Sequence, residues 1–143
     1  MFAFSEKLRT ETVAGDSRVI ALTRRVAVGL GLASIAAIHI LDIPGKFAET
    51  PYLAGLYLAL IVAAFVVMER LFVAGNRRDF VASAALSLAV IAGFVVNRTV
   101  GMPGAMDDIG NWLEPLGLLS LVVEGFVVWQ SIAAVVGMTR TPR

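Results

Sequence analysis

The chain has 143 residues, a formal net charge of +1 and a hydrophobic content of 58%, with a mean hydropathy of +0.83. That apolar content is more than a soluble domain of this length can bury, so the composition predicts an all-α integral membrane protein. Cysteine is absent and His39 is the single histidine, which excludes disulfides, thiolate metal sites and a zinc centre of three histidines within one chain. No basic run interleaved with aromatic residues points to nucleic acid as a partner.

Four apolar segments follow a charged arm. Residues 1–19 are predicted to form a cytoplasmic arm, residues 20–138 the membrane domain and residues 139–143 a cytoplasmic tail. The helices are expected at 23–43, 52–70, 80–100 and 112–136, because about 20 apolar helical residues cross a bilayer. Short links between them predict an up-and-down four-helix bundle.

The basic residues set the predicted orientation. Of the 12 lysines and arginines, only Lys46 and Arg98 fall on the side opposite the N-terminus. Since lysine and arginine in short loops mark the cytoplasmic side, both termini are predicted to be cytoplasmic. The outer side instead collects the acids Asp42, Glu49, Asp107, Asp108 and Glu114.

Glu124 lies near the middle of the fourth segment. An ionised carboxylate at that depth costs about 2.5 to 3.5 kcal/mol. It shares a helix face with Ser120 and Ser131, so this polar face should point into the bundle. Two interpretations stay open: a functional intramembrane acid, or a protonated acid that only makes a hydrogen bond to a neighbouring helix.

His39 and Asp42 lie three residues apart on one face of the first segment. The pair is suited to binding a cation or to orienting a ring nitrogen. The alternative is a histidine at the membrane interface that is hydrogen-bonded to Asp42 and water. His39 and Glu124 should differ in depth by roughly 6 Å, so one pocket could join them.

Residues 98–117 are rich in glycine and proline and are expected to fold back over the mouth of the bundle. Met102 and Met106 in this loop, together with His39 and Glu124, form a candidate metal site for copper or zinc, because thioether and imidazole suit Cu(I). The alternative is that the methionines only pack against protein or lipid.

Asn97 and Arg98 end the third segment, and Arg98 is the single arginine on the outer side. They complete a candidate set for binding a ligand or ion with His39, Asp42, Glu114 and Glu124. The favoured alternative for Arg98 is an ion pair with Asp42 and Glu114 that fixes the outer ends of the helices.

Three stretches carry a resemblance to known proteins: His39-Ile-Leu-Asp42, Arg98-Thr-Val-Gly-Met-Pro-Gly and Trp112-Leu-Glu-Pro-Leu-Gly. They resemble a loose group of small, uncharacterised four-span bacterial membrane proteins. The resemblance covers most of the membrane part but not the arm. It implies the four-span fold only, and it carries no activity. The predicted location is the inner membrane of a bacterium.

The sequence therefore predicts a protein, not an enzyme, that handles an ion, proton or metal through an outward-facing polar pocket. One alternative is an accessory subunit of a larger membrane complex, such as a respiratory one. In that case stripes of small residues, for example Ala59 and Ala63 or Ala89 and Gly93, would pack against partner helices or another copy of the chain. A second alternative is a membrane protein that binds quinone or another lipophilic ligand.

Overall fold

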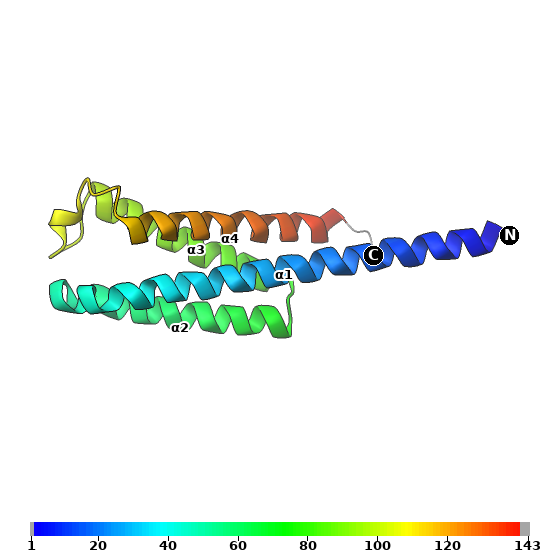
Figure 1. Cartoon of the computed structure of the whole chain (residues 1–143), viewed down its shortest axis with the longest axis horizontal. Helices are drawn as coiled ribbons and strands as arrows, with labels where there is room; N and C mark the ends of the chain where they lie inside the picture. The colour runs from blue at the N-terminus through cyan, green and yellow to red at the C-terminus, as the bar shows by residue number, and fades with distance from the viewer. Residues whose placement is uncertain (1, 141–143) are drawn as a thin grey trace.

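The structure is a computed structural model that describes residues 2–140, and it is entirely helical (Figure 1). Its elements are α1 (Phe2–Glu49), α2 (Pro51–Val73), α3 (Arg77–Thr99), the short 3-10 helix η1 (Met106–Asp108) and α4 (Pro115–Arg140). The four α-helices are all long and apolar enough to cross a membrane. The prediction of four helices of membrane-spanning character is thereby confirmed.

The helices run antiparallel to their sequence neighbours, and α4 packs on α1 as well as on α3 (Figure 1). We call the end that holds residues 100–114 the loop end, and the end that holds the turn at residues 74–76 the arm end. An apolar core near the arm end contains Val28, Leu32, Leu71, Phe80 and Val127. Many apolar side chains on the outside are exposed, including Leu30, Val62, Val122 and Trp129. This apolar exterior suits a lipid environment.

The first helix is longer at both ends than the apolar segment predicts. Residues 2–19, expected as an arm, continue α1 as a helix that projects beyond the bundle (Figure 1). At the other end the helix passes through Pro44 to Glu49, whereas its end was expected at Ile43. Proline removes the backbone donor of one helical hydrogen bond, but the chain still closes a turn after it, since the Thr50 N–H donates to the Lys46 carbonyl at 2.8 Å. Of the expected tail, residues 139 and 140 end α4, and residues 141–143 lie outside the described residues.

Local capping fixes where α3 begins. The side chain of Asn76 accepts hydrogen bonds from the backbone N–H groups of Arg78 and Asp79, at 2.9 and 3.3 Å. The carboxylate of Asp79 accepts one in return from the backbone N–H of Asn76, at 3.0 Å. This reciprocal capping box satisfies donors that have no partner inside the helix. Gly75 precedes it with φ +56, so the tight turn from α2 uses a conformation that favours glycine.

A glycine also sets the approach of α1 to α4. A Cβ atom at Gly31 would lie 2.3 Å from Cγ2 of Val127, so no side chain fits between the two helices there. Gly29 is similarly tight against the ring of Phe72 on α2, at 2.4 Å. These two glycines of α1 therefore allow close packing against α4 and α2.

Candidate functional site

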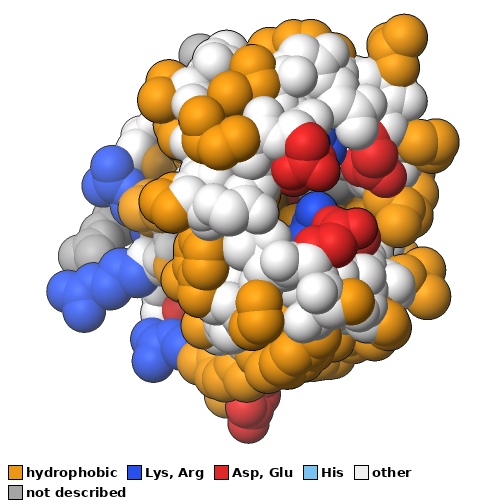
Figure 2. Space-filling view, turned by 90° about the vertical axis from the view of Figure 1, so that its left-hand side faces the viewer, with side chains coloured by type: hydrophobic (Ala, Val, Ile, Leu, Met, Phe, Trp, Pro, Cys, Tyr) orange, Lys and Arg blue, Asp and Glu red, His pale blue; other side chains and the backbone are white. Residues whose placement is uncertain are grey.

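A cavity of about 630 Å³ opens at the loop end and reaches the middle of the bundle between α2 and α3. Figure 2 looks onto this end and shows carboxylate groups around a hollow in which basic side chains are visible. Ala59 and Ala63 on α2 and Ala89 and Gly93 on α3 line it. The sequence predicted these stripes as helix contacts, but here the small side chains leave the space that forms the cavity.

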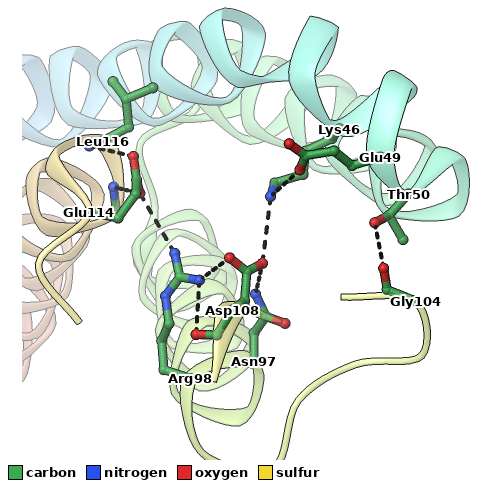
Figure 3. Close-up of polar contacts among 10 residues, drawn as sticks. Lys46, Glu49, Thr50, Asn97, Arg98, Gly104, Asp108, Glu114 and Leu116 are labelled. Carbon is green, nitrogen blue, oxygen red and sulfur yellow. Dashed lines mark hydrogen bonds and ion pairs between the residues drawn. The ribbon is translucent and has the colours of Figure 1, made fainter. Parts of the chain in front are cut away.

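Arg98 at the end of α3 is the centre of the polar contacts at the mouth (Figure 3). It is 6% exposed, and its Nη1 atom lies 2.6 Å from Oδ1 of Asp108. Its Nη2 atom lies 3.7 Å from Oε2 of Glu114, and its guanidinium stands 5.0 Å from the centre of the Phe94 ring. The predicted ion pair of Arg98 with Glu114 is present, whereas Asp108 takes the place expected for Asp42.

Asp108 in η1 joins two other helices, α3 and α1, through its carboxylate. Besides Arg98, it accepts a hydrogen bond from Nδ2 of Asn97 at 2.9 Å and lies 3.6 Å from Nζ of Lys46 on α1. Burial alone would raise the pKa of Asp108, but the hydrogen bonds from Asn97 and Arg98 and the charge of Lys46 hold this pKa below its ordinary value. The loop thus folds over the bundle end, as predicted, and Thr50 adds a hydrogen bond to the Gly104 carbonyl at 3.2 Å (Figure 3).

Glu114 has two roles at the start of α4. Its carboxylate accepts hydrogen bonds from the backbone N–H groups of Leu116 and Gly117, at 3.0 and 2.6 Å. The same carboxylate faces Arg98 (Figure 3). Because Glu114 caps the helix and Pro115 suits its first turn, α4 begins at Pro115 and not at Trp112, where the apolar pattern placed it.

His39 and Asp42 both line the cavity, but they are not bonded to each other. The Nδ1 atom of His39 lies 2.8 Å from the carbonyl oxygen of Ile35, and its ring meets the Tyr57 ring edge-on at 4.7 Å between centroids. Among the described residues, no basic nitrogen lies within ion-pair distance of Asp42. The other carboxylates of the wall, on Glu49, Asp108 and Glu114, each have a basic partner. Asp42 is therefore the unneutralised acid of the cavity.

Glu124 lies behind the wall of the cavity rather than in it. Its side chain is fully buried, and its Oε1 atom accepts a hydrogen bond from the hydroxyl of Ser120 at 2.5 Å. Ser120 itself lines the cavity, as does His39. The cavity predicted to join His39 and Glu124 thus contains the histidine and stops one hydrogen bond short of the acid.

The four predicted metal ligands are not brought to one place. His39 and Met102 line the cavity, Glu124 is sealed behind Ser120, and Met106 is 57% exposed on the loop. Within residues 2–140, no group of three or more histidine, cysteine or acidic side chains is arranged to hold a metal ion. The residues therefore give no support to the copper or zinc site.

Sequence reasoning missed three residues of the site: Asp108, Lys46 and Tyr57. Asp108 lies in a loop, where hydrophobic periodicity does not show how deep a residue lies in the bundle. Lys46 contributed to the sequence analysis only as one of the basic residues that set the orientation. The sequence still held a signal for Asp108 and Lys46. Lysine and arginine are rare on the outer side, and an acid in a glycine-rich loop that folds back over the bundle is a natural partner for them. The chain matches no protein-family model, no curated protein and no solved structure.

Proposed function

We propose that this chain is a multi-pass protein of a bacterial inner membrane that binds an ion through an outward-facing cavity. The proposed orientation rests on the positive-inside rule, because Arg70 lies in the last turn of α2 and Arg77 and Arg78 lie in the first turn of α3, all at the arm end. With that end in the cytoplasm, the loop end and its cavity face outward. The ligand then enters from the external side.

The charge of the cavity wall favours a cation. The wall contains the carboxylates of Asp42, Glu49, Asp108 and Glu114 and the basic groups of Lys46 and Arg98. Acids therefore exceed basic groups by two when His39 is neutral. The single observation that carries the proposal is Asp42, an acid in the wall without a basic partner, beside the aromatic rings of His39 and Tyr57. A cation near these groups gains both charge pairing and contact with an aromatic face.

The size and walls of the cavity favour an organic cation over a bare one. A volume of about 630 Å³ corresponds to roughly 20 water molecules and falls in the range of small-molecule sites. Below the polar mouth, the walls carry Leu56, Leu60, Leu86, Val90 and Phe94. A metal ion or a proton would leave these apolar walls unused. We therefore propose a lipophilic amine or ammonium ion as the ligand class.

The test uses two probes of matched shape and opposite charge. Binding of tetraphenylphosphonium and of tetraphenylborate is measured by equilibrium dialysis with the protein in lipid nanodiscs. We expect saturable binding of the cation only, weakened roughly tenfold by Asp42→Asn, since loss of one partly exposed charge pair amounts to about 1.4 kcal/mol. Asp107→Asn is the control, because Asp107 is exposed and does not line the cavity. Equal binding of both probes, or an unchanged affinity in Asp42→Asn, would refute the proposal.

A quinone is the second candidate ligand. The observation that favours it is the edge-on pair of His39 and Tyr57 above apolar walls, which offers polar anchors to a flat neutral ring. A soluble quinone analogue that binds with the same affinity to the wild type and to Asp42→Asn would support this ligand. Failure of the analogue to compete with tetraphenylphosphonium would exclude it from the cavity.

A further inference from the structure

Glu124 has one carboxylate oxygen that no group in the described part of the chain satisfies. Its Oε1 atom accepts the hydroxyl hydrogen of Ser120, whereas its Oε2 atom is buried without a partner. A buried carboxylate oxygen without a hydrogen bond is unfavourable in an apolar interior. The oxygen therefore calls for a donor or for a proton of its own.

Two serine hydroxyls in the described residues are also buried without a partner: Ser131, about two turns along α4 from Glu124, and Ser87 on α3. Of the two, Ser87 on α3 lies at the depth of Glu124. Its hydroxyl oxygen is also fully buried and also without a partner. The ring of Phe94 on α3 touches Gly117 on α4, which sets the register of these antiparallel helices. Ser87 and Glu124 each lie seven residues, about two helical turns, further into the bundle from that contact. They therefore lie at the same depth at the interface of α3 and α4, although no hydrogen bond joins Oε2 of Glu124 to the Ser87 hydroxyl in the structure.

No basic group neutralises Glu124 from the elements packed around it. The contacts of Gly31 with Val127 and of Gly29 with Phe72 place Glu69 and Arg70 of α2 nearest to Glu124 in depth, toward the arm end. Both side chains are exposed, and Arg70 pairs with Asp79. His39 on α1 and Tyr57 on α2 lie toward the loop end at the wall of the cavity. On α3 the charged residues are near the ends, with Asp79 and Arg98 about 12 and 16 Å along the helix from Ser87. On the other side of Glu124 lies the apolar core around Val127. Such surroundings favour the neutral acid over the carboxylate.

We propose that Glu124 holds a proton on Oε2, that a rotation of the two side chains lets Glu124 donate this proton in a hydrogen bond to the Ser87 oxygen, and that a cation entering the cavity exchanges for this proton. The exchange rests on the proposed function. As the cation binds, the proton leaves Glu124 past Ser120 to water in the cavity, and Glu124 becomes a carboxylate. One positive charge enters and one leaves, and no covalent bond of the ligand changes. Ser120 is the positioning residue between the cavity and the acid.

The first experiment tests the proton without any ligand. Infrared spectroscopy at pH 7 should show the C=O stretch of a protonated carboxylic acid that Glu124→Gln removes. Ser87→Ala should shift this band to higher frequency. Without the hydrogen bond from the acid O–H to Ser87, the C=O bond of the acid has more double-bond character. Ser83→Ala is the matched control: Ser83 is equally buried one turn away, but its hydroxyl already donates to the Asp79 carbonyl at 2.8 Å. Absence of the band, or a band that Ser87→Ala leaves unchanged, would overturn the assignment.

The second experiment tests the exchange. Tetraphenylphosphonium is added to wild-type protein in weakly buffered nanodiscs, and released protons are counted with a pH dye against bound probe. We expect about one proton per bound ion, since the exchange conserves charge, and none per bound ion in Glu124→Gln. Binding without release in the wild type overturns the exchange and leaves the proposed function standing. If the wild type does not bind the probe, the proposed function and the exchange both fail, and the infrared result alone decides the proton on Glu124.

Discussion

The contact between Arg98 and Asp108 offers the sharpest test of how the loop end is held together. Arg98 is 6% exposed, and its closest acidic partner is Asp108 at 2.6 Å. We expect Asp108→Asn to lower the free energy of unfolding, because it leaves the arginine buried with the weaker partner Glu114 at 3.7 Å. The amide would also lose the charge that faces Lys46.

The size of the loss follows from the burial of the pair. Removing one partner of a fully buried ion pair costs about 3 to 5 kcal/mol. The side chain of Asp108 is 17% exposed, Glu114 remains near Arg98, and asparagine keeps one acceptor oxygen. We therefore expect about 2 kcal/mol, below that range.

The measurement is denaturant and thermal unfolding in detergent micelles, with Asp107→Asn as the control. Asp107 is the neighbouring exposed residue, so this change should leave stability within about 0.5 kcal/mol. A double-mutant cycle of Asp108→Asn with Arg98→Met isolates the pair, and its coupling should be about 2 kcal/mol. A coupling near zero, or equal effects of the two asparagine variants, would refute the reasoning.

Three further predictions concern pH and helix geometry. Because folding lowers the pKa of Asp108 below its ordinary value, the contribution of this carboxylate to stability is present above the ordinary value and is lost as pH falls through the lower folded value. Unfolding midpoints measured from pH 6 to pH 2 should therefore decline less in Asp108→Asn than in the wild type. Gly31→Ala should lower the free energy of unfolding by about 1 to 3 kcal/mol, because the new Cβ clashes with Val127. Gly55→Ala is the control: a Cβ there meets no atom within 4 Å, so this change should be neutral or stabilising in the same unfolding assay. Asn76→Ala removes the acceptor that caps α3 and should cost about 1 kcal/mol, with faster amide hydrogen exchange in the first turn of α3; unchanged exchange there would contradict the capping role.

The helices were predictable because their signal is local. A run of about 20 apolar residues is a property of composition, so the four helices could be read before any packing was known. The ends were less accurate. Pro44 predicts a stop, but α1 continues to Glu49, and α4 begins at Pro115 because Glu114 caps it. Tertiary and capping contacts, which no hydropathy pattern records, decide such boundaries.

The candidate site was predictable in its residue types and depth but not in its pairings. Arg98 with Glu114 was expected and is present, whereas the closest partner of Arg98 is Asp108 in a loop whose path no periodicity describes. His39 was expected to meet Asp42, but its ring bonds to the Ile35 carbonyl and packs on Tyr57. These outcomes depend on how the loop closes over the bundle end.

The sequence by itself determined the number of helices and the excess of acids at the loop end. It also determined that Asp42 lies nearer the loop end than Glu124. These follow from distances along a helix, which the residue count fixes at about 1.5 Å per residue. Only the tertiary structure decided that the small residues of α2 and α3 enclose a cavity and that Glu124 lies behind Ser120. The physical reason is that depth along a helix is set by position in the chain, whereas the direction of a side chain is set by the rotation of each helix against its neighbours.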